Sequence, residues 1–157
     1  VDAGGMYLDL GLLNDAERLA DEAVRLDPRS AGAWRLHGRV AMARGQFEGA
    51  VADLQRAVAI AGDDRDAIAD IARSYMALGR PRRVLATLAV LDEAGGSAGL
   101  PPDRLALEAR AQEQLGRTTE AADAWRRAIA AGTAPPDAAA RVAALEAAGD
   151  PGASVHR

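Results

Sequence analysis

Arginine supplies every basic side chain of this sequence, since none of its 19 basic residues is a lysine. Three of these arginines, Arg39, Arg73 and Arg110, recur at intervals of 34 and 37 residues. A guanidinium group donates two parallel hydrogen bonds to one carboxylate, which makes arginine well suited to hold acidic ligands. If the fold gathers these arginines on one surface, they predict a binding site for carboxylates.

The other reactive side chains form no catalytic or metal-binding pattern. The chain has no cysteine, and its two histidines, His37 and His156, are not part of a motif with zinc-ligand spacing. No serine sits in a nucleophile-elbow sequence, and the glycines at 95–96 are not followed by a phosphate-loop lysine. The sequence therefore predicts a protein that is not an enzyme and uses no cofactor or metal. His37 is predicted to be a core or half-buried packing residue.

The composition argues against nucleic acids and membranes as partners. The net charge is -4 and the pI is near 5.2, so the chain has no general attraction to polyanions. A short basic cluster, Arg80, Arg82 and Arg83, leaves a nucleic-acid contact as the alternative to a solvated turn, although no aromatic platform lies near it. No stretch approaches the roughly 20 apolar residues of a membrane span, so no membrane insertion is expected.

Glycines recur with the period of a helix–turn–helix unit. Gly11, Gly45 and Gly79 are 34 residues apart, and Gly116 follows after 37 because a Gly/Ser-rich loop at 95–99 adds three residues. Each of these glycines is predicted to end a helix, where it enters the left-handed region without strain. Small residues at fixed offsets are predicted to bring the two helices of a unit close together; they are Gly4, Ala16, Ala23, Gly38, Ala50, Ala57, Ala72, Ala109, Ala121 and Ala128.

This pattern predicts helices throughout the chain, near 2–10, 13–26, 31–44, 47–60, 65–78, 82–94, 102–115, 118–131 and 136–148. The helices form an expected array over 1–148, with repeats at about 1–30 (its start missing), 31–64, 65–98 and 102–135, and a cap helix at 136–148. The cap helix is expected to turn Val142 and Leu145 inward and Arg141 and Glu146 outward. A frayed tail is expected at 149–157.

The repeated rows resemble the tetratricopeptide repeat, a 34-residue helix–turn–helix unit. The second row carries the family's large, glycine, aromatic and alanine positions most completely, as Trp34, Gly38, Phe47, Ala50, Leu54 and Ala57. The resemblance implies an all-α fold, a right-handed α-solenoid of antiparallel helix pairs. It also implies a non-catalytic scaffold for protein–protein interaction, in which stacked units bury apolar faces that one hairpin cannot bury alone.

The resemblance further implies that the first helices of the rows line a concave groove, which holds a peptide segment of a partner protein. The residues expected to line it are Arg35, Arg39, Met42, Arg73, Met76, Arg110, Glu113 and Arg141. Arginine favours carboxylates and methionine adapts to varied apolar groups, so the expected segment is acidic or ends in a free carboxylate beside apolar residues. The alternative is that the arginines pair along their own helices, as the spacing of Asp70 and Arg73 allows.

Two alternatives to a free-standing scaffold are left open. The chain starts at Val1 rather than methionine, so it is interpreted as a fragment or processed form, and as the interaction module of a larger enzyme, receptor or transcriptional regulator in the second hypothesis. No signal peptide is visible, and the compartment is left open between the cytoplasm, slightly favoured, and the periplasm. A third hypothesis is homo-oligomerisation through the incomplete first repeat, with Met6, Leu10 and Leu13 as its apolar edge.

Overall fold

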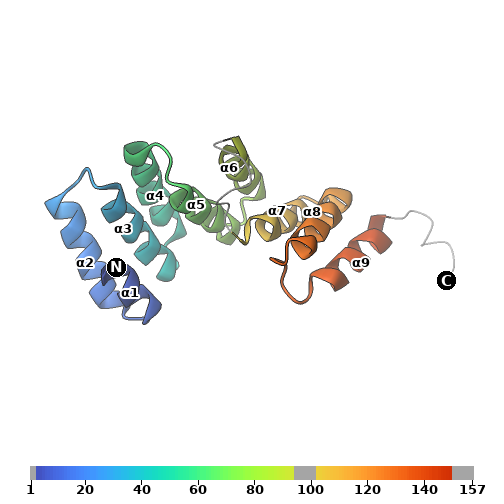
Figure 1. The fold of residues 1–157 in the computed structure, drawn as a ribbon, viewed down its shortest axis with the longest axis horizontal. Helices are drawn as coiled ribbons and strands as arrows, with labels where there is room; N and C mark the ends of the chain where they lie inside the picture. Colours follow the sequence, from blue (N-terminus) through green and yellow to red (C-terminus); the bar gives the residue numbers. More distant parts are fainter. Residues whose placement is uncertain (1–2, 94–101, 150–157) are drawn as a thin grey trace. The chain divides into compact units, whose positions relative to one another are not determined.

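The computed structural model describes residues 3–93 and 102–149, and all regular structure within these ranges is α-helical (Figure 1). The helices are α1 Ala3–Asp9, α2 Leu13–Leu26, α3 Ala31–Ala43, α4 Phe47–Ala61, α5 Arg65–Ala77, α6 Pro81–Glu93, α7 Arg104–Gln114, α8 Thr118–Ala130 and α9 Ala138–Gly149. Every predicted helix is confirmed to within two residues at each end. The loop at 95–99 and the tail from 150 lie outside the described residues, and the repeat boundaries stay a prediction.

The chain divides into two compact units, Val1–Gly79 and Arg80–Arg157. In the N-terminal unit each helix packs on the next, and α3 additionally contacts both α1 and α5. In the C-terminal unit α6 packs on α7, α7 on α8, and α8 on α9. In the N-terminal unit this brings the first helices of successive rows, α1, α3 and α5, side by side.

The helix ends follow the local sequence. Gly45 ends α3 with a φ of 75°, and its N–H donates to the Met42 carbonyl at 2.9 Å. The other three predicted cap glycines also have positive φ, and so do Gly62 after α4 and Gly132 after α8, which the sequence reasoning did not single out. At its start, α3 is capped by Ser30, whose hydroxyl accepts a hydrogen bond from the Ala33 N–H at 3.2 Å.

Helices α7 and α9 begin two residues later than expected, after their Pro-Asp pairs. Before α9 the Ala138 N–H donates to the Pro135 carbonyl at 3.0 Å. This single turn precedes the helix proper, at whose start the Arg141 N–H donates to the Asp137 carbonyl at 3.1 Å.

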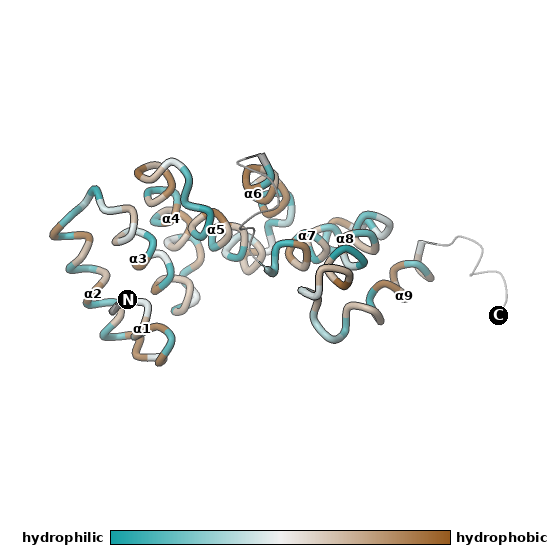
Figure 2. The backbone as a smooth tube through the Cα atoms, in the orientation of Figure 1, coloured by the Kyte–Doolittle hydropathy of each residue, from teal (hydrophilic) through white to brown (hydrophobic). Residues whose placement is uncertain are grey.

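Small residues bring α3 and α4 into close contact in the N-terminal unit. Gly38 is buried, and a Cβ added to it would lie 2.7 Å from Leu54 Cγ and 3.3 Å from the Ala50 carbonyl oxygen. Leu54 and Ala50 are themselves fully buried. Figure 2 shows apolar and polar residues alternating along the helices, as expected when each helix buries one face.

The core of the C-terminal unit is built around one large side chain. Trp125 is fully buried against alanines of α7, α8 and α9, among them Ala109 and Ala138. Val142 and Leu145 of α9 pack against this cluster, which confirms their predicted inward orientation. Thus α9 closes over the Trp125 cluster with its apolar side.

We predict that Gly38→Ala destabilises the N-terminal unit. The added methyl group overpacks a closed core, which typically costs about 1–3 kcal/mol, and the better helix propensity of alanine offsets about 1 kcal/mol. We expect a net loss of about 1 kcal/mol in the free energy of unfolding, measured by urea denaturation followed by circular dichroism.

The matched control is Gly49→Ala in α4, where an added Cβ meets no atom within 4 Å. This change should raise stability by about 0.5–1 kcal/mol through helix propensity alone. Equal stabilisation by both changes would contradict the requirement for close helix approach at Gly38.

Candidate functional site

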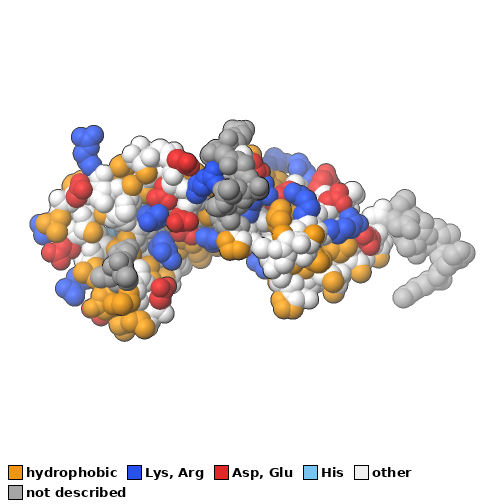
Figure 3. Space-filling model, viewed as in Figure 1, with side chains coloured by type: hydrophobic (Ala, Val, Ile, Leu, Met, Phe, Trp, Pro, Cys, Tyr) orange, Lys and Arg blue, Asp and Glu red, His pale blue; other side chains and the backbone are white. Residues whose placement is uncertain are grey.

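A charged hollow lies between α3 and α5 in the N-terminal unit. It has a volume of about 260 Å³ and is lined by Arg35, Arg39, Asp66, Asp70 and Arg73. Figure 3 shows side chains of both charges gathered over these two helices. The packing of α3 on α5 thus brings together three of the predicted groove arginines, and two aspartates with them.

The first layer of the hollow is formed by Arg35 with Asp64 and Asp66. Arg35 Nη1 lies 3.0 and 3.3 Å from the two carboxylate oxygens of Asp64, and 3.6 Å from Asp66 Oδ2. Asp64 also caps α5 by accepting the Ala67 N–H at 3.0 Å. The Asp64 side chain is only 9% exposed, so this cap is nearly buried.

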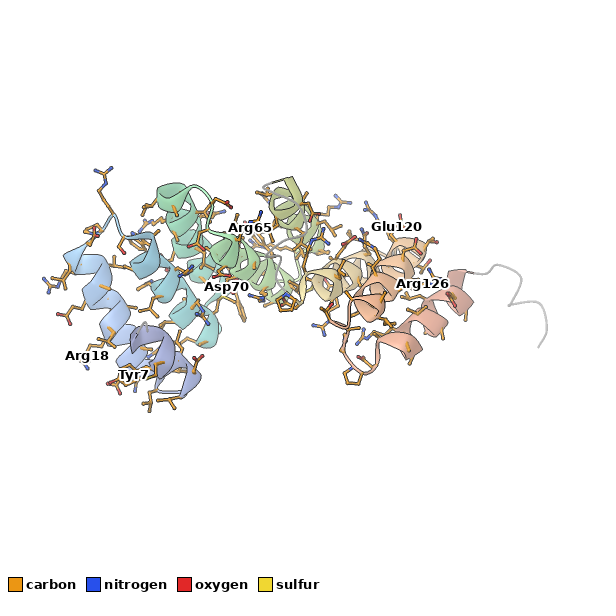
Figure 4. The ribbon with its side chains drawn as sticks, in the orientation of Figure 1. Tyr7, Arg18, Arg65, Asp70, Glu120 and Arg126 are labelled. Atoms are coloured by element: carbon orange, nitrogen blue, oxygen red, sulfur yellow. The ribbon has the colours of Figure 1, made fainter. Side chains whose placement is uncertain are left out.

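The second layer is formed by Asp70 between Arg39 and Arg73. Asp70 Oδ1 accepts a hydrogen bond from Arg73 Nη1 at 2.6 Å, so at this residue the pairing along α5 that was the alternative to ligand binding is present. Asp70 Oδ2 lies 3.8 Å from Arg39 Nε of the neighbouring helix. The Asp70 side chain is 11% exposed, whereas that of Arg39 is 47% exposed. A nearly buried carboxylate of α5, labelled in Figure 4, therefore faces a guanidinium from each helix.

Met42 and Met76 are half-buried on α3 and α5, three residues after Arg39 and Arg73. Residues three apart lie on one face of a helix. Each methionine therefore lies on the same side of its helix as the arginine that lines the charged hollow. Their contact with a ligand stays a prediction.

The other three predicted groove residues belong to the C-terminal unit, where two of them share a structural network. Glu113 Oε1 accepts the Trp125 indole N–H at 2.7 Å, and Glu113 Oε2 lies 3.0 Å from Arg141 Nη1. The Arg141 guanidinium also lies over the Trp125 ring, 5.6 Å from its centroid. This explains why Glu113 occupies the row position that holds methionine in the two preceding rows. A carboxylate is needed there to satisfy a buried indole N–H and a cation of α9.

Arg141 is only partly exposed, although it was predicted to point outward. Its side chain pairs with Glu113 of α7 and with Asp137 at the start of α9. Its Nε donates to Asp137 Oδ2 at 2.7 Å. This hydrogen bond lowers the pKa of Asp137 and raises that of Arg141, and the charge of exposed Arg110 lowers the Asp137 pKa further. A second pair, Arg126 with Glu146, joins α8 to α9 (Figure 4 labels Arg126).

His37 bridges two helices that flank α3, a role that sequence reasoning missed. Its Nδ1 lies 2.7 Å from Asp53 Oδ2 of α4, and its Nε2 lies 3.1 Å from Asp21 Oδ1 of α2. The predicted half-buried state is confirmed, since the side chain is 33% exposed. Asp21, His37 and Asp53 lie on three different helices, so the sequence pattern by itself did not pair them. Within residues 3–93 and 102–149, no cluster of His, Cys, Asp or Glu is arranged to hold a metal ion.

Apolar side chains are exposed at the start of the N-terminal unit. Met6, Leu10 and Leu12 are exposed, whereas Leu13, which the sequence reasoning placed on this edge, is partly buried. Self-association through this edge stays a prediction. No helix in the described part of the chain is both long and apolar enough to span a membrane.

Comparison with known proteins gives a consistent result. Two family models, both described as tetratricopeptide repeat, match residues 3–65 and 41–98. No curated protein matches the chain by sequence.

Solved structures share the fold. The "MamA RS-1 ArsTM double mutant" is 13% identical with a TM-score of 0.82, covering 96% of this chain and 83% of its own. A crystal structure of MamA protein is 25% identical with a TM-score of 0.69, and the match covers 82% of this chain and 68% of the MamA chain. TTC0263, a thermophilic TPR protein in Thermus thermophilus, is 20% identical with a TM-score of 0.68, covering 91% and 77%.

We predict that Glu113→Met destabilises the C-terminal unit, although methionine is the residue of the equivalent positions 42 and 76. The change leaves the buried Trp125 N–H without its acceptor and Arg141 without its carboxylate, a loss of about 1–3 kcal/mol. Urea denaturation followed by circular dichroism measures the change in the free energy of unfolding. Glu113→Gln keeps an acceptor for the indole and should cost less. Unchanged stability of the methionine variant would refute a structural role for Glu113.

A second prediction concerns the acid sensitivity of α9. Because the folded-state pKa of Asp137 is lowered, its ion pair stabilises the unit above the ordinary pKa of aspartate, about 3.9, and this contribution is lost as pH falls through the lowered pKa. The melting temperature of Asp137→Asn should therefore lie below that of the unchanged protein at neutral pH, and the two should converge in acid. A difference that is independent of pH would show that Asp137 acts through packing or capping instead.

Proposed function

We propose, starting from the chain's membership of the tetratricopeptide-repeat family, that it holds a peptide segment of a partner protein against α3 and α5. The fold of this family indicates a protein-interaction scaffold in general, and its members are generally not enzymes. The finer statement, a carboxylate-bearing segment in the charged hollow, is supported by the side chains that line this hollow.

One observation carries the proposal: the Arg39 side chain is about half exposed, and its ion-pair contact with Asp70 is made at Nε. This contact, at 3.8 Å, is its one ion-pair contact among the described residues. A guanidinium so placed keeps its Nη donors for a ligand carboxylate. Since Asp70 also fixes Arg73, part of the ordering cost of a binding site is met before the ligand arrives.

The apolar part of the ligand is assigned to Met42 and Met76. Both lie one turn further along the helices that carry Arg39 and Arg73. Methionine is unbranched and polarizable, so it accommodates several apolar side chains with little loss of contact. The proposed ligand is therefore a short segment in which a carboxylate and an apolar residue lie close together, either inside a chain or at its C-terminus.

We predict that peptides selected from a displayed random library carry carboxylates, and that Arg39→Gln weakens their binding. Loss of a hydrogen bond to a charged group is worth about 1.5–3 kcal/mol, so the Kd should rise by a factor of about 10 or more. Fluorescence anisotropy with the selected peptides measures the Kd, and added salt should raise it.

The control is Arg18→Gln, the same chemical change at an exposed arginine of α2 outside the hollow. It should leave the Kd unchanged, and circular dichroism should show that both variants remain helical. Failure to enrich any peptide, or equal weakening by the two variants, would overturn the proposal.

A further inference from the structure

The charged hollow presents both signs of charge to a ligand, and not arginine alone. Asp70, which lines it, and the neighbouring Asp64 are nearly buried and pair with the arginines. The outward-facing groups are Arg39 and Asp66, and the Asp66 side chain is 85% exposed. Its one ion-pair contact among the described residues is Arg35 Nη1 at 3.6 Å, and the same Nη1 already donates to Asp64 at 3.0 Å.

Arg39 and Asp66 belong to different layers of the hollow. Arg35 faces Asp66 in the first layer, and Arg39 faces Asp70 in the second. Four residues separate the layers on both α3 and α5, which is about 6 Å along each helix. Along the helix axes, the carboxylate of Asp66 and the guanidinium of Arg39 are therefore offset by about one helical turn.

This arrangement sets the charges that a ligand must carry. A ligand with carboxylates at both layers would be attracted by Arg39 and repelled by Asp66, whereas one with a cation beside its carboxylate would be attracted twice. In an extended peptide, residues i and i+2 point to the same side and are about 6–7 Å apart. This spacing matches the distance between the layers.

We propose that the hollow selects an extended segment in which a lysine or arginine lies two residues from a carboxylate, with the cation on Asp66 and the carboxylate on Arg39. This inference rests on the proposed function and names the class of segment that the same site takes. Asp66 is then a specificity-determining residue, because it rejects purely acidic segments that an arginine-lined site would otherwise accept.

The test sequences the peptides that the protein selects from the displayed random library and then measures three forms of the tightest one. The forms carry a lysine, an alanine or a glutamate two residues from the acidic position. We expect the Kd to rise about two- to fivefold from lysine to alanine, the range of one exposed ion pair, and further for glutamate. With Asp66→Lys the order should invert, so that the glutamate form binds most tightly.

Two further variants keep the result interpretable. Asp66→Asn keeps the size of the side chain and should abolish the preference without inverting it. Asp63→Lys makes the same charge change at an exposed residue near the start of α5 that does not line the hollow, and it should leave the preference unchanged.

The outcomes separate the two proposals. Selected peptides that bind through Arg39 but show no preference for a cation would overturn the inference and leave the proposed function standing. An inversion by Asp63→Lys as large as that by Asp66→Lys would also overturn it, because the selection would then follow net charge. If no peptide is selected at all, both proposals fall.

Discussion

The close contact of α3 and α4 through Gly38 is the constraint on which the N-terminal unit depends. Leu54 and Ala50 of α4 occupy the space that a side chain at position 38 would need. Helix α4 packs on α5 as well as on α3, so it fixes both helices that carry the charged hollow. Any widening of the α3–α4 contact would separate Arg39 from Asp70, and a site made of ion pairs between helices loses its geometry over about an ångström.

Buried carboxylates give the hollow its order. Taking Asp64 and Asp70 out of water is unfavourable unless each is paired, and both have arginine partners across the α3–α5 contact. Such pairs contribute less to stability than to specificity, because they fix which side chains face each other. Here they hold three arginines in place while leaving Arg39 and Asp66 open to solvent. The protein is acidic overall, yet this local surface is close to balanced in charge.

The two units use equivalent sequence positions for different purposes. Met42 and Met76 of the N-terminal unit are half-buried, but Glu113 of the C-terminal unit is part of a network with Trp125 and Arg141. The reason is Trp125, the large buried residue that Glu113 contacts. A large buried indole needs an acceptor for its N–H, and a carboxylate supplies it and also pairs with α9. The helices therefore recur in each row, whereas the residue at this position and its contacts differ between the two units.

The sequence by itself determined the helices, their glycine ends and the family, because these depend on local rules. A glycine with positive φ and the period of apolar residues act within one or two turns, and the small residues recur with the repeat itself. It also predicted that Arg39 and Arg73 are neighbours, since equal positions in stacked repeats lie side by side, and that Arg35 extends this row of arginines. Only the tertiary structure decided that Asp64 and Asp70 are nearly buried among these arginines. It also decided that Glu113 of α7 pairs with Arg141 of α9. The division into two units and the Asp21–His37–Asp53 contacts were likewise decided there. Ion pairs between different helices depend on how those helices pack, and the spacing of residues along one helix gives no information about that packing. The sequence could therefore identify the charged residues but not their partners.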